Sequence, residues 1–508
     1  MTSTPEKPTS PQPPSPSRPS AGSKTPTTPA KAKAKATPTA KTANHKTTAQ
    51  PQPSRPWWSR WIPQGMPDDD RGRMRMVVDN IVLHIHPTKV PKRTLRFTYT
   101  WGLGGLSAFL LVLLISTGVL LEMHYTPSAP QAYLDMLQLE SQVPFGSFIR
   151  AIHHWAANLL IVTVTLHMLR VFLTGAYKPP RGTNWVVGIL LFLLVVGANF
   201  TGYLLPWDQL AYWAITVGTG IISYVPFIGD TLSRLLLGGS EVSGRTLLNF
   251  YTLHISVIPI SIVLLASYHF WRIRKDGGLT IPKAPGEVLG RGLERVTTIP
   301  NLVRCEVVYA LIWSALLVGW AMWVPAPLEG IANPNVSPNP AKAPWYFAGL
   351  QELLLHFHPV IAAIFIPTVA LIALAALPWL DPFPENVGTY FRTRRGRYLS
   401  LMAVGLALLL TPAWVAADAF LLDWVGWLPD WPTWISNGIL PLAFLVAGAV
   451  LLHSFLRLTL KTTHEERVLF WFIFFFTAFV VLTIIGIFFR GPNMDLYWPW
   501  AMPTGTHG

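Results

Sequence analysis

Apolar stretches of about 20 residues recur through this 508-residue sequence and constrain its fold more than any other feature. An apolar helix of about 20 residues crosses the roughly 30 Å hydrocarbon core of a bilayer. The chain is 51% hydrophobic and only 13% charged, which is a low charged fraction for a soluble protein. We therefore predict an all-α, polytopic membrane protein with nine spans, near residues 101–123, 148–173, 184–205, 251–272, 305–325, 360–380, 399–417, 437–457 and 467–489.

The net charge of +14 does not indicate a nucleic-acid partner, because much of it lies in one terminal segment. Residues 1–56 carry nine Lys and Arg against a single acidic residue, Glu6. The segment is rich in Pro, Thr, Ala and Lys, so we predict a disordered tail. It lacks the apolar core of a secretory signal peptide. A solvated extension and a segment that touches anionic lipid are both compatible with its composition.

Basic residues at the ends of the predicted spans indicate the topology, because positive charge marks cytoplasmic loops. With the N-terminus inside, the basic loops after the second, fourth, sixth and eighth spans all fall on the cytoplasmic side: Lys178 and Arg181; Arg272, Arg274 and Lys275; 392–397; Arg457, Lys461 and Arg467. We predict a cell-membrane protein with a cytoplasmic N-terminus and a C-terminus outside.

Histidines in two of the spans form a pattern that suggests metal ligation. His153 and His167 lie 14 residues apart, within about 40° of the same helix face and about 21 Å apart along the axis. His254 and His269 lie 15 residues apart, within about 60° and about 22 Å. The neighbouring His154 diverges from His167 by about 140°, so we expect it to be replaceable.

The predicted topology makes these two spans parallel, so His153 lies at the depth of His254 and His167 at the depth of His269. The single cysteine, Cys305, excludes internal disulfides, four-Cys iron–sulfur sites and a CxxCH haem attachment. Two imidazoles per site suit a six-coordinate haem better than zinc, which prefers four ligands. The pattern predicts two bis-histidine haem sites.

Glycines and arginines near the histidines agree with this interpretation. The flanking spans carry two glycine pairs at the same 14-residue interval, which would leave room for two macrocycles: Gly104 and Gly118, Gly188 and Gly202. Haem propionates need cationic partners, and three arginines lie near the ends of the histidine spans: Arg150, Arg170 and Arg181. Ordinary membrane-boundary arginines are the alternative.

The stretches "IRAIHHWAANLLIVTVTLHMLRVFLTG", "PRGTNWVVG", "TGYLLPWDQLAYWAITVGTG" and "NFYTLHISVIP" resemble cytochrome b of the cytochrome bc complexes, the quinol:cytochrome c or plastocyanin oxidoreductases. The resemblance covers 98–275 and 300–417. The 15-residue histidine interval resembles the chloroplast type, here fused to the C-terminal half. The last two spans and the ending "FFRGPNMDLYWPW" extend beyond the family pattern.

The resemblance implies a catalytic subunit that oxidises quinol on the outer side. Electrons would cross through an outer haem, held by His153 and His254, and an inner haem, held by His167 and His269, to an inner quinone site, with proton translocation. The implied partners are a Rieske-type iron–sulfur subunit and a c-type cytochrome in a homodimeric complex. Residues at matching positions would line the outer quinol site (Tyr203, Asp208, Trp345, Tyr346) and the inner quinone site (Arg274). Anchoring at the cytoplasmic membrane boundary is the alternative for Arg274.

Two departures from the family pattern affect the chemistry. Pro344 stands where the family's Pro-Glu-Trp-Tyr motif has its glutamate, and Glu352 is the candidate replacement as proton acceptor. A surface or capping role is the alternative for Glu352. Gly102 stands where chloroplast-like relatives carry the cysteine of a covalent haem, so we predict two non-covalent b haems and no covalent one.

These features predict a four-helix di-haem bundle followed by about five further spans. The expected segments are a tail (1–56), a cytoplasmic interfacial segment (57–100), the di-haem domain (101–275), a linker (276–304), a quinol-site domain (305–417) and two extra helices with an outer aromatic tail (418–508). Two other classes remain open at this point. A di-haem anchor of a dehydrogenase would not need the 343–352 loop, and a transporter would be expected to show repeated halves.

Overall fold

The computed structural model describes residues 65–80, 83–290 and 292–503. The predicted disordered tail, residues 1–56, lies outside the described residues, as do the first residues of the predicted interfacial segment. Within the described part of the chain, nine helices are long and apolar enough to cross a membrane. The prediction of an all-α polytopic protein is confirmed, and each predicted span overlaps one of these helices.

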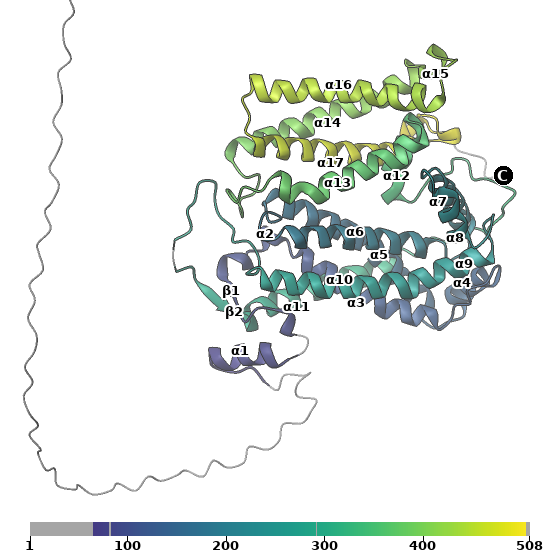
Figure 1. Cartoon of the computed structure of the whole chain (residues 1–508). Helices are drawn as coiled ribbons and strands as arrows, with labels where there is room; N and C mark the ends of the chain where they lie inside the picture. The colour runs from purple at the N-terminus through teal and green to yellow at the C-terminus, as the bar shows by residue number, and fades with distance from the viewer. Residues whose placement is uncertain (1–64, 81–82, 291, 504–508) are drawn as a thin grey trace, which may run out of the picture. The chain divides into compact units, whose positions relative to one another are not determined.

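The first four spanning helices pack into a bundle (Figure 1). They are α3 (Leu103–Glu122), α5 (Gly146–Leu173), α6 (Gly182–Tyr203) and the run Gly244–Lys275, which consists of α9 (Gly244–Thr252), a π-helical turn and α10 (Ile258–Lys275). Short helices follow or precede them in the connecting segments: α1 (Asp70–Asp79), α2 (Phe97–Thr100), α4 (Gln131–Ser141), α7 (Gln209–Ser223) and α8 (Gly229–Leu237).

The π-helical turn at Leu253–Val257 contains His254 and precedes Pro259. Proline lacks an N–H and clashes with the carbonyl four residues earlier, and a widened turn relieves that clash. The same arrangement occurs before Pro367 and Pro441. A π turn accommodates about one extra residue. The 15-residue spacing of His254 and His269 is therefore equivalent to the 14-residue spacing in the regular helix α5.

The remaining spans are α11 (Thr298–Trp323), which packs against α3 and α5, and four helices on the other side of α6 (Figure 1). Those four are α13 (Ile366–Leu380), α14 (Arg394–Phe420), α16 (Leu440–Ser454) and α17 (His464–Phe488). The short helices α12 (Ala348–His356) and α15 (Trp424–Trp427) lie between them in sequence. A buried apolar cluster joins α5 and α6 to α14 and α17 through Phe172, Trp185, Leu399 and Phe470. The ninth helix is therefore part of the core.

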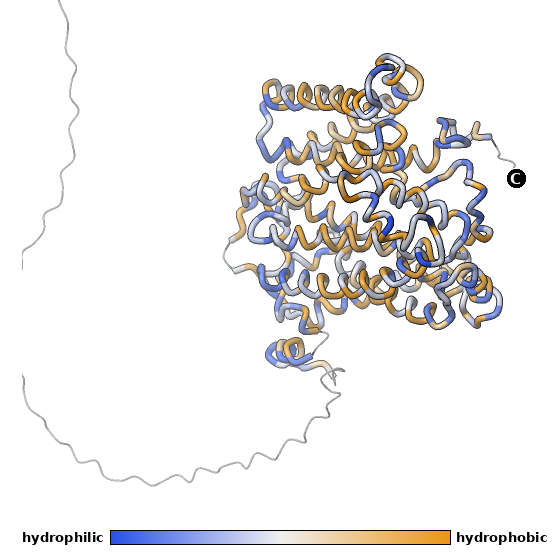
Figure 2. The backbone as a smooth tube through the Cα atoms, turned by 45° about the vertical axis from the view of Figure 1, so that its right-hand side comes forward, coloured by the Kyte–Doolittle hydropathy of each residue, from blue (hydrophilic) through white to orange (hydrophobic). Residues whose placement is uncertain are grey.

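Opposite ends of the bundle carry different connecting elements (Figure 1). One end holds α1, α2 and a two-stranded antiparallel sheet in which β1 (Lys89–Pro91) pairs with β2 (Arg295–Thr297). The other holds α4, α7 and α8, and we call it the outer end, following the predicted topology. The long helices are hydrophobic along their middle and more hydrophilic toward their ends (Figure 2), as expected of spans.

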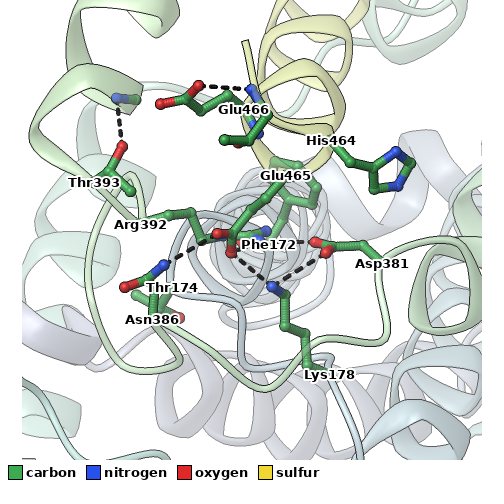
Figure 3. Close-up of polar contacts among 12 residues, drawn as sticks. Phe172, Thr174, Lys178, Asp381, Asn386, Arg392, Thr393, His464, Glu465 and Glu466 are labelled. Atoms are coloured by element: carbon green, nitrogen blue, oxygen red, sulfur yellow. Dashed lines mark hydrogen bonds and ion pairs between the residues drawn. The ribbon is translucent and has the colours of Figure 1, made fainter. Parts of the chain in front are cut away.

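A buried ion cluster ties the first four spans to the later ones at the inner end (Figure 3). Lys178, in the α5–α6 connection, contacts Asp381 at 3.2 Å and Glu465 at 2.6 Å. Arg392 contacts Asp381 at 2.8 Å and Glu465 at 3.0 Å. Burial alone would raise the pKa of Asp381, but hydrogen bonds from Tyr177 and Arg392 hold that pKa below its usual range. The positive charges of Lys178 and Arg392 are thus balanced by the negative charges of Asp381 and Glu465.

Candidate functional site

At the outer end, His153 on α5 faces His254 on the neighbouring helix. Their ring centroids lie 6.3 Å apart, with an interplanar angle of 71°. Two metal–nitrogen bonds of about 2.0 Å, plus about 1.1 Å from each nitrogen to its ring centre, sum to about 6.2 Å. The observed separation therefore fits one metal ion between the two imidazoles.

The second ring nitrogen of each outer histidine is held by a neighbouring helix. His153 Nδ1 lies 2.9 Å from Thr117 Oγ1 on α3, and this hydroxyl donates to the Leu113 carbonyl, which leaves its oxygen to accept from the ring. His254 Nδ1 lies 3.0 Å from the Ala198 carbonyl on α6. Ligating histidines typically donate their other N–H in this way. Both Nε2 atoms are therefore left for the metal.

The four predicted glycines each lie opposite one of the four histidines. The nearest histidine atom to an added Cβ is Cε1 in every case, at 3.1 Å for Gly104 and His167, 3.4 Å for Gly118 and His153, 3.8 Å for Gly188 and His269, and 2.5 Å for Gly202 and His254. The tightest approach, at Gly202, leaves no room for a side chain. Residues of α3 and α6 thus make space for the imidazoles themselves.

At the inner pair, an unpartnered arginine nitrogen fits a bound group. Within the described residues, Arg170 Nη2 is buried and without a hydrogen-bond partner. Arg170 donates through Nε to the Tyr99 carbonyl at 3.0 Å, and its guanidinium lies 4.4 Å from the Tyr99 ring centre. Its free nitrogen, one turn beyond His167, suits an anionic propionate.

The other two predicted arginines make contacts within the protein. Arg150 binds Glu140 at 2.5 Å and donates to the carbonyls of Ala326 and Pro327. Arg181 donates to the carbonyls of Asp276 and Gly278. Of the three, Arg170 therefore has the clearest spare capacity for a propionate.

His154 faces a different set of partners. Its Nε2 lies 3.3 Å from Asn158 Nδ2, and Asn158 Oδ1 accepts a 2.5 Å hydrogen bond from Trp345 Nε1. These hydrogen bonds link α5 to the segment before α12 and do not include His254.

An apolar cavity of about 200 Å³ lies at the outer end between α6, α7 and the segment 338–354. Its lining includes Phe200, Trp213, Gly218, Pro344 and Gln351. The five residues predicted for the outer site are absent from this lining, but each is within three positions of a lining residue in sequence.

The structure gives four of those five residues, and the inner-site residue Arg274, the following surroundings. Asp208 caps α7 by accepting from Ala211 N and also accepts from Glu329 N, while burial raises its pKa. The Tyr346 hydroxyl is buried without a partner among the described residues, and burial raises its pKa. Tyr203 is the last residue of α6, and Trp345 binds Asn158. At the inner end, Arg274 donates to the His84 carbonyl at 2.7 Å.

Glu352 lies in a buried polar network that the sequence did not indicate. Arg490 binds its two oxygens at 2.5 and 3.0 Å, and His356 Nε2 lies 3.2 Å from it. His356 Nδ1 reaches Asp418 at 2.6 Å. Burial would raise the pKa of Glu352, but hydrogen bonds from His356 and Arg490 lower it; burial would lower the pKa of His356, but Asp418 and Glu352 raise it. The one sequence feature that could have indicated this network is the four-residue spacing of Glu352 and His356, which places them on the same helix face.

Comparison with known proteins assigns the family. Residues 89–277 match the family model described as Cytochrome b/b6/petB. The chain is 43% identical over 180 residues to the menaquinol:cytochrome c reductase cytochrome b subunit of Geobacillus thermodenitrificans, covering 35% of this chain and 80% of that protein. The chain belongs to the cytochrome b family.

Other relatives of this cytochrome b extend the match. It is 40% identical over 217 residues to cytochrome b6 of Heliobacterium modesticaldum (43% of this chain, 97% of the relative). It is 35% identical over 311 residues to the cytochrome bc complex cytochrome b subunit of Chlorobaculum thiosulfatiphilum (60% and 71%). The fold resembles a chain of a hyperthermophilic respiratory Complex III, with a TM-score of 0.56 and 22% identity over 78% of this chain and 93% of that one.

Membership of this family establishes a haem-binding subunit of an oxidoreductase complex in electron transport. The transporter and dehydrogenase-anchor interpretations are therefore set aside. The histidine pairs, their spacing and the spare nitrogen of Arg170 fit haem as the bound group.

Proposed function

We propose that this cytochrome b oxidises quinol at its outer end and passes electrons across the membrane to an inner quinone site. The proposal rests chiefly on the 6.3 Å separation of the His153 and His254 rings, with the second histidine pair about 20 Å deeper by helix rise. When bound, two b haems would supply one-electron transfer between the two depths. His153 and His254 would hold the outer haem, and His167 and His269 the inner one.

The chain's own residues fix the ligand orientations in this proposal. Thr117 and the Ala198 carbonyl hold the outer imidazoles through Nδ1, and Arg170 offers Nη2 to an inner propionate. Gly102 supports non-covalent attachment, because it has a φ of +62° and an added Cβ would lie 2.5 Å from Tyr309. A cysteine at this position would meet both a backbone and a packing conflict.

The outer cavity is the proposed quinol pocket. Its apolar lining suits a quinone ring, and it borders the Trp345–Tyr346 motif and α7. Relatives named menaquinol:cytochrome c reductase make menaquinol the first substrate to test. Arg274 is the proposed inner-site residue. Oxidation outside and reduction inside would release and take up protons on opposite sides, with the N-terminus in the cytoplasm.

The proposed complex needs partners that hold the missing redox centres. The single cysteine leaves no ligand set for an iron–sulfur cluster or a c-type haem, so a Rieske-type subunit and a c-type cytochrome would supply them in a dimeric assembly.

Glu352→Gln tests the proton-acceptor hypothesis for the outer site, which requires the Glu352 carboxylate to reach the pocket although Arg490 binds it on the face of α12 opposite the cavity lining. We expect the purified wild-type complex to oxidise a menaquinol or ubiquinol analogue, and the variant to do so at least about tenfold more slowly, because general acid–base groups contribute factors of this order or more. Haem absorbance should be unchanged. Exposed Glu294, paired with Lys92 at the inner end, provides the control variant Glu294→Gln. Unchanged turnover in Glu352→Gln would reject the acceptor role, and no quinol oxidation by the wild type would reject the proposed function.

A further inference from the structure

The segment that follows α17 contacts the wall of the outer cavity at three separate points. We call residues 487–493 the C-terminal clamp. It lies outside the family match at 89–277, and the sequence alone assigned it no mechanistic role. Its three contacts fall on Asn339, Lys342 and Glu352: Asn339 and Glu352 flank the cavity-lining stretch 341–351, and Lys342 lies within it.

The first contact is the buried ion pair between Arg490 and Glu352. Their side chains are 5% and 0% exposed. The guanidinium binds the carboxylate through two nitrogens, and it also donates to the Met494 carbonyl at 2.9 Å within the tail. His356 lies within 3.4 Å of Arg490 and links the pair to Asp418 on α14. Bidentate arginine–carboxylate pairs fix geometry as well as charge.

The second and third contacts hold the loop before α12. Asn339 and Asn493 form a reciprocal pair, in which Asn339 Nδ2 donates to Asn493 Oδ1 at 2.9 Å and Asn493 N donates to Asn339 Oδ1 at 2.6 Å. Lys342, which lines the cavity, donates to the Ile487 carbonyl at 2.9 Å.

Close helix packing makes the clamp rigid. An added Cβ at Gly486 on α17 would lie 2.9 Å from the Ala348 carbonyl oxygen, and one at Gly349 on α12 would lie 2.6 Å from Thr483 Oγ1. The two glycines let α12 and α17 approach at backbone distance, so a shift of α17 would move α12.

Opposite faces of α12 serve the cavity and the clamp. Leu350, Gln351 and Leu354 line the cavity, and at about 100° per residue they cover one face. Glu352 and His356 project from a direction about 170° away, toward Arg490. A change in the contact between Glu352 and Arg490 would therefore shift α12, and with it the cavity-lining residues on its opposite face.

We propose that the C-terminal clamp positions the wall of the quinol pocket, with Arg490 as its principal positioning residue. The expected consequence of the clamp is tighter quinol binding, and that consequence rests on the proposed function. Through these contacts, the ninth span and the clamp support the loop that departs from the Pro-Glu-Trp-Tyr motif.

The test compares the purified wild-type complex with Arg490→Gln and Asn493→Ala. We expect increased hydrogen–deuterium exchange in peptides covering 338–352 and a rise of about tenfold in the KM for a menaquinol analogue in Arg490→Gln, because small misplacements of binding groups have effects of this size or larger. Asn493→Ala, which removes one exposed amide and places alanine at a φ of +61°, should change both in the same direction by less. Haem absorbance and exchange in α5 should stay at wild-type values.

Trp500→Ala is the matched control, because Trp500 lies in the same tail, 80% exposed and stacked on Trp498. It should leave exchange and KM unchanged. If both clamp variants show the hydrogen–deuterium exchange and the KM of the wild type, the proposal is overturned. If Arg490→Gln does not assemble, the same two measurements on Asn493→Ala decide whether the proposal stands. Increased exchange in the clamp variants, with no quinol oxidation by the wild type, would support the clamp and overturn the proposed function. A lower kcat at constant KM in Arg490→Gln would overturn positioning.

Discussion

Replacing His153 with alanine is expected to remove one of two haems per chain and to abolish electron transfer across the membrane. His153 faces His254 at 6.3 Å, and no other described histidine is paired with that ring. Without His153, the outer haem would keep only His254 as a protein ligand. Haem content of the purified complex, from a reduced-minus-oxidised spectrum, measures the loss.

His154→Ala is the adjacent control. His154 contacts Asn158, and through it Trp345, so its removal should leave both haems in place. If His154→Ala lost a haem while His153→Ala retained both, the assignment of ligands on α5 would be wrong.

The second large effect concerns the buried ion cluster at the inner end. Asp381→Ala leaves Lys178 and Arg392, whose side chains are 0% and 1% exposed, with Glu465 as their remaining carboxylate. Removing one partner of a buried ion pair typically costs about 3–5 kcal/mol of folding free energy. We expect the variant to unfold at a clearly lower temperature, or to accumulate poorly in the membrane.

The exposed pair of Lys92 and Glu294 provides the comparison for that measurement. Both side chains are more than half exposed, so Glu294→Ala should change stability by less than about 1 kcal/mol. Thermal unfolding of the detergent-solubilised complexes checks both variants. Equal unfolding temperatures for Asp381→Ala and Glu294→Ala would show that the cluster does not stabilise the joint between the two groups of spans.

Much of the fold was predictable because apolar length and histidine spacing are local properties of the sequence. The nine spans, and the four histidines on two of them, follow from residue counts and helix geometry. The glycines at 14-residue intervals were also visible, although the structure places them against the imidazoles.

The π turn at His254 was not predicted, although Pro259 provided its cause. Regular α-helical geometry gave a 60° offset for the 15-residue interval, whereas the widened turn makes that interval equivalent to 14 residues, so that it matches the interval between His153 and His167. The angle between two side chains around a helix axis was calculated from their spacing for a regular α-helix. That calculation fails where a proline induces a π-helical turn.

Long-range polar contacts were beyond the sequence analysis. Arg490 and Glu352 are 138 residues apart, and nothing local indicates that they pair. Likewise, no local pattern indicates that the carboxylate of Asp208, predicted for the quinol site, caps α7 and accepts from the Glu329 backbone. The five outer-site residues stay predictions to be tested by substitution.

The central claim is that α5 and the Gly244–Lys275 helix hold two non-covalent b haems between paired histidines. The haem-to-protein ratio of the purified chain, measured before and after acid–acetone extraction, tests it most directly. We predict two b-type haems per chain, both extractable. One haem per chain, none, or a haem that stays attached to the protein after extraction would contradict the account.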